Sequence, residues 1–241
     1  MRAGLPQFFG IQDLVLPRQT EPTQMAEPAA VYGIKQVVFD QEISLTQNII
    51  LVQGRSALIS TVQQIDKLHK LVQEDPLVNA AVSPEIAPTL STLCHQAGLA
   101  STILFEDFPE PHHRESETAY QLRMERVEYV NQFCSREGIK PTVLADREMR
   151  NSLTHIDRDL ADSLTEREGV GWFIDVAVET RADFDTHEDI DELRFCRSYI
   201  IGEDTILHLG QEMDLEKLRW QCVAVLAVVF GVDYDDQFQG S

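Results

Sequence analysis

The residues best suited to chemistry lie close together in the segment REMRNSLTHIDRDLADSL, residues 147–164. Arg150 is followed directly by Asn151, and His155 comes four residues after Asn151, so a helix would place the amide and the imidazole on one face. An imidazole can accept or donate a proton near neutral pH, and a guanidinium can stabilise developing negative charge. The three residues are therefore the predicted catalytic residues.

The segment that carries these residues has the apolar spacing of an amphipathic helix. Thr142 is the expected N-cap and Gly169 the expected stop, while Arg147 and Arg158 should lie one turn before and after the catalytic residues. A helix holds reacting groups more firmly than a loop does. The predicted buried stripe is Met149, Leu153, Ile156, Leu160 and Leu164.

Most of the remaining chain shows helical periodicity. Apolar residues recur at helical spacing from Ala29 to Gln73, with Gly54 as a predicted break between two helices. Further helices are expected over Leu90–Leu104 and over Ser116–Glu137, with Gly138 as a left-handed stop. Asp214 should cap a final helix whose core face is formed by Leu215, Leu218, Cys222, Val225 and Val229.

Three segments do not fit this pattern. Glu106–Arg114 contains two prolines and is expected to be a loop, and the acidic stretch Asp175–Glu192 is expected to be a solvated connection or an exposed helix. Leu193–Ile201 and Thr205–Leu209 flank a Gly-Glu-Asp turn and predict a β-hairpin. The fold class is therefore mainly all-α, with an extended arm over 1–28, a helical bundle over 29–232 that includes the hairpin near 193–210, and an acidic tail over 233–241.

The composition limits the classes of function. The 241 residues carry a formal net charge of −20, which disfavours broad, charge-driven binding of nucleic acid, so any RNA contact would have to be local. The four cysteines are scattered and are expected to be free and buried, and no apolar run is long enough to span a bilayer. A cytoplasmic protein is expected.

The string Arg150-Asn151-Ser152-Leu153-Thr154-His155 resembles the motif of the HEPN (higher eukaryotes and prokaryotes nucleotide-binding) superfamily. That motif is an Arg, four to six residues, and then a His, most often with Asn, Asp or His directly after the Arg. The wider strings MRNSLTHIDRDLADSL and RSYIIGEDTILHLGQEMDLEKL are similar to bacterial HEPN-like proteins over roughly the C-terminal half of the chain.

The resemblance implies a helical bundle of the HEPN type that forms a homodimer, with the Arg-His patches of two copies in one cleft. It also implies a metal-independent endoribonuclease or RNA-binding effector in bacterial stress, toxin–antitoxin or phage-defence systems. His155 would move the 2′-hydroxyl proton or protonate the leaving oxygen, Arg150 would stabilise charge on the phosphoryl oxygens, and Asn151 would orient His155 or the phosphate. The product would end in a 2′,3′-cyclic phosphate, and no cofactor or metal is expected.

Plainer interpretations remain open for the same residues. Arg150 could pair with Asp146 and His155 with Asp159 as ordinary surface neighbours. The chain would then be a non-enzymatic helical protein for dimerisation or for binding a basic partner, as an acidic antitoxin or inhibitor does. The acidic stretch is expected to be a solvated face rather than a metal site. No metal binding is expected at the histidines, which are His95, His112, His113 and His208. Trp172 and Trp220 are expected to be core or interface residues.

Overall fold

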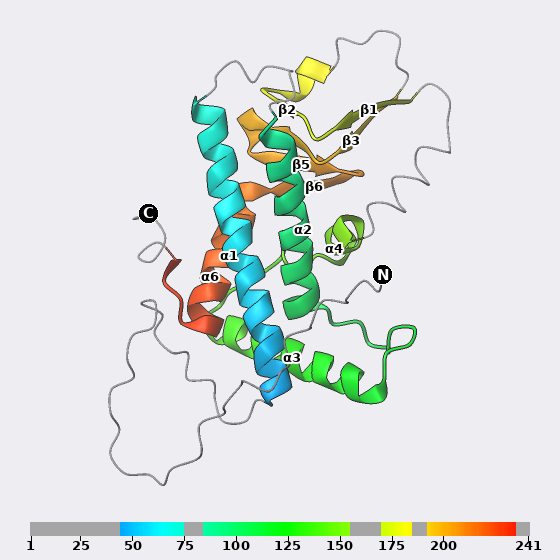
Figure 1. Ribbon diagram of the computed structural model, residues 1–241, viewed down its shortest axis with the longest axis vertical. Helices are drawn as coiled ribbons and strands as arrows, with labels where there is room; N and C mark the ends of the chain where they lie inside the picture. The colour runs from blue at the N-terminus through cyan, green and yellow to red at the C-terminus, as the bar shows by residue number, and fades with distance from the viewer. Residues whose placement is uncertain (1–43, 75–83, 155–169, 185–191, 235–241) are drawn as a thin grey trace, which may run out of the picture. The chain divides into compact units, whose positions relative to one another are not determined.

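The computed structural model describes residues 44–74, 84–154, 170–184 and 192–234. The described part is mostly helical, with a smaller set of strands in its C-terminal half (Figure 1). The predicted arm over 1–28 lies outside the described residues, and so does most of the predicted tail over 233–241. The helices are α1 (Leu45–Glu74), α2 (Ile86–Phe105), α3 (Glu117–Arg136), α4 (Arg147–Thr154) and α6 (Leu215–Phe230).

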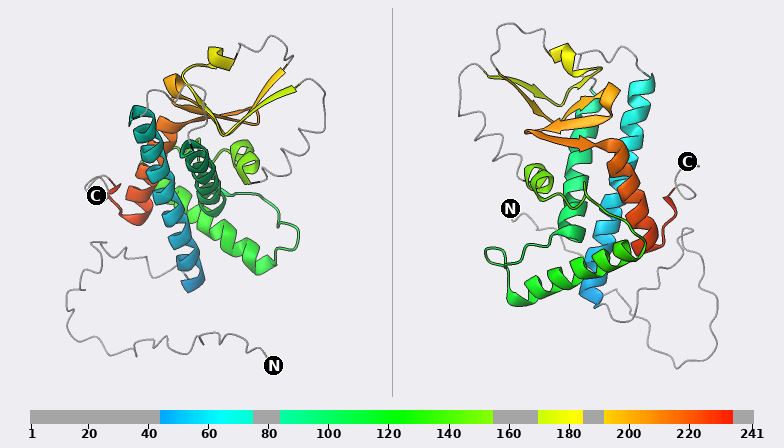
Figure 2. Two further views of the ribbon diagram at one scale, coloured as in Figure 1. Left: turned by 45° about the horizontal axis from the view of Figure 1, so that its top comes forward. Right: turned by 180° about the vertical axis from the view of Figure 1, so that it is seen from behind.

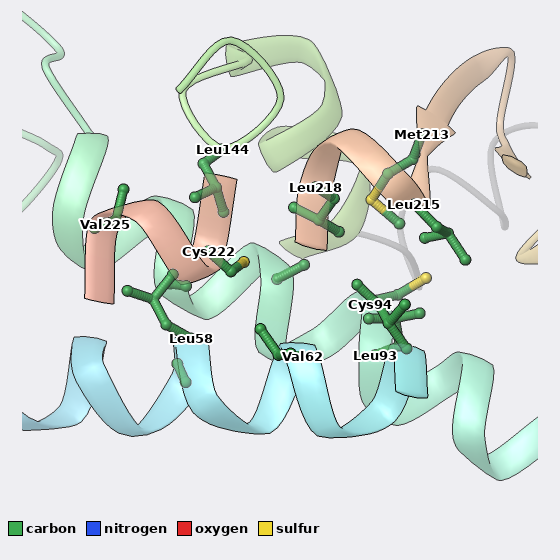
Figure 3. Packing of buried hydrophobic residues seen from close by; sticks show 14 of the residues in the cluster. Leu58, Val62, Leu93, Cys94, Leu144, Met213, Leu215, Leu218, Cys222 and Val225 are labelled. Atoms are coloured by element: carbon green, nitrogen blue, oxygen red, sulfur yellow. The ribbon is translucent and has the colours of Figure 1, made fainter. Parts of the chain in front are cut away.

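The main core lies where α1, α2 and α6 pack together. Leu58 and Val62 of α1 face Cys222 and Val225 of α6, with Leu93 of α2 close by (Figure 3). These side chains are almost completely buried, as the apolar stripes on the two helices predict. The four cysteines are free and buried, which confirms their prediction. Among the described helices, none is both long enough and apolar enough to cross a membrane.

Gly54 does not break α1, so the predicted division into two helices is wrong. The helix runs without interruption from Leu45 to Glu74. A Cβ atom on Gly54 would lie only 2.6 Å from Cδ2 of Leu104 and 3.0 Å from Cγ2 of Ile103, both on α2. The glycine is therefore a point of close helix packing rather than a helix stop.

The predicted helices are confirmed as α2, α3 and α6, although α2 begins at Ile86, four residues before the predicted Leu90. The predicted end signals of α3 and α6 are also confirmed. The Ser116 side chain accepts a hydrogen bond from the Ala119 N–H at the start of α3, and Gly138 follows that helix with φ of 69°. The Asp214 carboxylate accepts from the Lys217 N–H at the start of α6. Trp220 lies on α6 but is 56% exposed, so it is not a core residue.

Helix α4 begins five residues later than Thr142, the predicted N-cap. Residues 142–145 form a turn that the buried Gln221 of α6 holds in place. Its Oε1 accepts from the Val143 and Leu144 N–H groups, and its Nε2 donates to the Thr142 hydroxyl at 3.1 Å. The helix start is capped instead by Asp146, whose Oδ1 accepts from the Met149 N–H at 2.9 Å.

The strands form two sheets near the C-terminal end of α1 and the N-terminal end of α2 (Figures 1 and 2). In the first sheet β1 (Val170–Ile174) pairs in parallel with β3 (Glu192–Cys196). In the second sheet β2 (Ala177–Val178) pairs in parallel with β4 (Ser198–Ile200), which continues antiparallel to β5 (Thr205–His208) and then to β6 (Gln211–Asp214). The predicted hairpin is confirmed as β4–β5, but its predicted first strand, Leu193–Ile201, is divided at Arg197 into β3 and β4, which belong to different sheets.

The acidic stretch is not simply solvated. Ala177 and Val178 form β2 and are each 5% exposed, because they pair with the buried strand β4. The single turn of 3-10 helix η2 (Arg181–Phe184) follows, and residues 185–191 lie outside the described part. The prediction of a solvated connection or an exposed helix is therefore wrong for Ala177 and Val178, which form a short buried strand within the acidic sequence.

Candidate functional site

The three predicted catalytic residues meet different environments. Arg150 is only 3% exposed, and its Nε lies 4.0 Å from Oε1 of Glu106, the residue that follows α2. Asn151, the next residue along α4, is exposed. His155, like Arg158 and the last three residues of the predicted stripe, lies outside the described residues. The first two residues of that stripe, Met149 and Leu153, are buried.

Arg150 is not the surface residue that a pairing with Asp146 would require. The Asp146 carboxylate caps α4, and the guanidinium of Arg150 turns toward the helical core. The cavity beside it has a volume of only about 10 Å³ and is lined partly by Ser101 and Met149. That volume suffices for about one water molecule at most, so no phosphodiester fits there while the surrounding side chains keep these positions.

The loop that covers this end of α4 is organised by one buried guanidinium, that of Arg123 on α3. Its Nε and Nη2 form paired hydrogen bonds with the Glu115 carboxylate at 3.1 and 2.9 Å. The same guanidinium also donates to the backbone carbonyl oxygens of Glu106, Phe108 and Glu110. The hydrogen bonds from Arg123 lower the pKa of Glu115 to about 2, against the opposing effect of burial. The Pro-rich loop predicted over 106–114 is therefore present and has a defined shape.

That loop brings an imidazole and an aromatic ring to α4. The two oxygens of the Glu106 carboxylate reach in two directions, toward Arg150 and toward Nε2 of His112 at 3.3 Å. The His112 ring stacks on Phe108, with centroids 5.6 Å apart and planes 11° from parallel, and the Arg147 guanidinium lies 4.8 Å from the Phe108 centroid. We call these five residues, Glu106, Phe108, His112, Arg147 and Arg150, the α4–loop cluster.

The α4–loop cluster combines groups that suit contact with a polynucleotide. An exposed guanidinium can bind a phosphate, and an aromatic ring stacked with an imidazole offers a surface for a base. The carboxylate between Arg150 and His112 can hold the imidazole in one orientation. The sequence did not indicate Phe108 and His112 as site residues. Their loop is separated from α4 by the whole of α3, and no local sequence pattern predicts a contact over that distance.

Other reactive residue types are placed less favourably. Burial raises the pKa of the Cys94 thiol to about 12, so this residue is a poor nucleophile. His208 is completely buried, where its Nε2 donates to the Ser152 carbonyl at 3.1 Å and its Nδ1 lies 3.9 Å from the Cys196 sulfur. In the part of the chain that the structure describes, no three His, Cys, Asp or Glu side chains are grouped so as to hold a metal ion.

The chain was compared with protein-family models, with curated proteins and with solved structures. No family model matches it, and neither a curated protein nor a solved structure matches it. The functional argument therefore rests on the residues of this chain and on their arrangement around α4.

Proposed function

We propose that this protein is a HEPN-like, RNA-acting effector that cleaves or binds RNA without a metal ion, at the surface where α4 meets the loop 106–116. The observation that carries the proposal is the continuous contact from Arg147 through Phe108, His112 and Glu106 to Arg150. The motif residues Asn151 and His155 belong to the same segment. The setting in bacterial stress, toxin–antitoxin or phage-defence systems rests on the sequence resemblance alone.

Burial changes the role that we assign to Arg150. Its guanidinium is turned inward beside Glu106, so in this arrangement it positions the carboxylate that in turn contacts His112. The exposed side chains of Arg147 and Asn151 are the groups that can reach a phosphate from α4. Arg150 would touch the phosphodiester itself only if Glu106 moved aside, as the binding of an anion would favour.

The proposed reaction is an internal transesterification. The 2′-hydroxyl oxygen attacks the phosphorus as His155 takes its proton, the bond to the 5′-oxygen breaks, and that oxygen receives a proton. The products are a 2′,3′-cyclic phosphate and a 5′-hydroxyl, with no water consumed. His112, held by Glu106, supplies the second imidazole that such a reaction uses for its acid.

The net charge of −20 requires that binding of RNA be local. Arg147 stacks on an aromatic ring and is exposed, so it can act as a local cationic contact despite the acidic surroundings. Few phosphates would be neutralised in such a complex, and we therefore expect binding with a shallow salt dependence.

The test is cleavage of end-labelled RNA by the full chain in EDTA. His155→Ala should reduce the rate by about 10²–10⁴-fold, the range expected for loss of a general acid or base. His112→Ala should also slow cleavage, whereas His113→Ala, at the exposed neighbouring position in the same loop, should not. The cyclic phosphate end identifies the reaction.

Two results would contradict this function. One is a parent protein that neither cleaves nor binds RNA, and the other is a His155→Ala variant that cleaves as fast as the parent. If the parent binds RNA without cleaving it, the proposed role is restricted to binding, and Arg147→Gln should then weaken the complex while Arg181→Gln should not.

A second candidate function, helical dimerisation or partner docking, is favoured by an apolar stripe on α1. Leu45, Ile49 and Val52 are 76%, 55% and 46% exposed and lie at steps of four and three along one face of the helix. Exposed apolar patches of this kind often mark interaction sites. We propose that this stripe contributes to pairing of two copies, which a HEPN-like protein would need for a shared cleft.

The oligomeric state tests this candidate. Ile49→Asp should shift the mass in solution from a dimer to a monomer without loss of helix content, because the position is exposed in the single chain. Gln63→Asp, at an exposed position of the same helix far from the stripe, is the matched control. A parent that is monomeric at all concentrations, or an Ile49→Asp variant that stays dimeric, would remove this stripe from the interface.

A further inference from the structure

A second polar cavity lies between α2, α4 and the sheets, and it shares no residue with the α4–loop cluster. Its volume is about 180 Å³. Pockets for drug-sized ligands usually measure about 300–1,000 Å³, so this one suits a small group. Its described lining consists of Ser91, Cys94 and His95 from α2, Leu153 from α4, Arg197 after β3, and His208 from β5.

The cavity lies at a place where two parallel strands end together. Asp175 follows β1 and Arg197 follows β3, and both residues have left-handed backbone conformations, with φ of 57° and 53°. Such conformations are unfavourable for residues other than glycine and persist only where the surrounding structure enforces them. The carboxyl ends of neighbouring parallel strands are a common location for ligand sites in proteins.

The Arg197 guanidinium is held in a fixed orientation at the cavity. Its Nε and Nη2 form short paired hydrogen bonds with the two oxygens of Asp175, at 2.6 and 2.7 Å. Its Nη1 reaches toward the Ser91 hydroxyl at 3.4 Å. A guanidinium has five N–H groups, so these three contacts leave donors on Nη1 and Nη2 for a further acceptor.

The charge of the lining is opposite to that of the whole chain. The protein has 40 acidic residues against 20 basic ones, yet the described lining has one arginine, two histidines and no carboxylate. His208 uses Nε2 for the Ser152 carbonyl, so it forms a wall, and the donors available to a ligand are those of Arg197, His95 and Ser91. A tetrahedral oxyanion can accept from all three.

We propose that this cavity binds a phosphate group, either as inorganic phosphate or as the end of a small phosphate monoester. Arg197 supplies the cationic donors, Ser91 the hydroxyl, and His95 the third donor at the mouth of the cavity, where it is exposed. Asp175 fixes the arginine without lining the cavity. The site is independent of RNA cleavage at the α4–loop cluster.

The test is calorimetric titration of the full chain with inorganic phosphate at constant ionic strength. Saturable binding of one phosphate per chain is expected. Ser91→Ala and His95→Gln should each weaken it by on the order of tenfold, as for loss of one hydrogen bond to a charged group. A parallel titration with glycerol 3-phosphate distinguishes the two sources, since the tighter ligand identifies whether the free ion or a monoester is preferred.

Controls separate the site from the stability of the fold. Arg197→Gln leaves Asp175 unpaired, so it is combined with Asp175→Asn, and this double variant should bind no phosphate although its charge is balanced. Arg181→Gln is the matched control, because Arg181 also pairs with carboxylates, those of Glu203 and Glu212, but does not line the cavity. No saturable binding by the parent, or equal affinity in the parent and the double variant, would overturn the proposal.

Discussion

The two ends of α2 pack by different means. Toward its middle and start, α2 packs mainly against α1 through apolar side chains such as Leu93, which is completely buried. At its C-terminal end Ile103 and Leu104 still pack against α1, and the neighbouring α3 and α4 add three arginines at 3–7% exposure, namely Arg123, Arg126 and Arg150. Apolar packing thus runs along the whole of α2, and buried guanidinium groups are added only at the end that carries the candidate site.

The difference shows how one helix can take part in two kinds of packing. Apolar contacts are individually weak and numerous, whereas each buried guanidinium depends on a few oxygens at fixed positions. Arg126, for example, donates from Nε to the Ile103 carbonyl at 2.6 Å, near the last turn of α2. We therefore expect single substitutions at the arginine-rich end to have larger and more local effects than equal changes in the core.

Replacement of Arg123 by Gln should have the largest effect. It removes the guanidinium that pairs with the Glu115 carboxylate and donates to the carbonyl oxygens of the loop, which should cost about 3–5 kcal/mol, as for breaking a buried ion pair. Urea unfolding of the full chain measures this loss. Arg114→Gln, at an exposed position in the same loop, should change stability by less than about 0.5 kcal/mol.

The stabilisation that Arg123 provides should also depend on pH in a definite direction. Arg123 lowers the pKa of Glu115 from 4.5 to about 2, so its contribution is present above pH 4.5 and is lost as the pH falls toward 2. The stability gap between the parent and Arg123→Gln should therefore narrow below pH 4.5. If the difference in stability between the parent and Arg123→Gln stays constant down to about pH 2, the ion pair with Glu115 is not the source of the stabilisation by Arg123.

Leu58→Ala tests the apolar side of the comparison. Leu58 is fully buried between α1 and α6, so truncation should cost about 2–5 kcal/mol through lost burial and the cavity left behind. Ile49→Ala on the exposed stripe of the same helix should cost less than about 0.5 kcal/mol. If Ile49→Ala loses as much stability as Leu58→Ala, the exposed stripe of α1 must be covered by another surface in solution.

The apolar body could be predicted from the sequence to a large extent. The stripes of α1 and α6 and the caps Ser116 and Asp214 are local signals, and the structure confirms them. The parallel pairs β1–β3 and β2–β4 could not be predicted, because their strands are short and their partners are distant in the sequence. The late start of α4 was missed because Thr142 contacts Gln221 of α6, a tertiary interaction that overrides the local capping signal.

The candidate site was less predictable than the body. The Arg150 side chain was expected at the surface, since charged residues on a helix usually face water. Its burial beside Glu106 depends on the fold of the loop 106–116, which in turn depends on Arg123. Residue type and spacing located the helix of interest, but the contacts of Phe108 and His112 with it required the tertiary structure.

Gly54→Val should have a smaller effect, on the contact between α1 and α2. The added methyl groups would meet Leu104 and Ile103, and overpacking of this kind typically costs about 1–3 kcal/mol. The difference in stability between Gln63→Gly and Gln63→Val, at an exposed position of the same helix, measures the change from glycine to valine in the helix alone. If Gly54→Val changes the stability by that same difference, the close approach at Gly54 contributes nothing beyond helix propensity.

The smallest expected effect concerns the polar contact that joins α1 to the second sheet. Asp204 accepts from His69 Nε2 and from the Tyr199 hydroxyl, each at 2.8 Å. The hydrogen bond that His69 donates to Asp204 raises the pKa of His69 above 6.5, against the opposing effect of burial. A raised pKa in the folded state means that the contribution is present below 6.5 and is lost as the pH rises through the folded value.

We therefore expect the urea midpoint of the parent to fall between about pH 6 and pH 8, and the fall to be shallower in His69→Gln, which cannot titrate. The effect should be small because His69 is partly exposed, and because Arg219 nearby opposes the charge that Asp66 and Asp204 favour. His113→Gln, at an exposed position in the loop 106–116, should retain the slope of the parent. Equal slopes in the parent and His69→Gln would show that the contact of α1 with the second sheet is insensitive to the charge of this histidine.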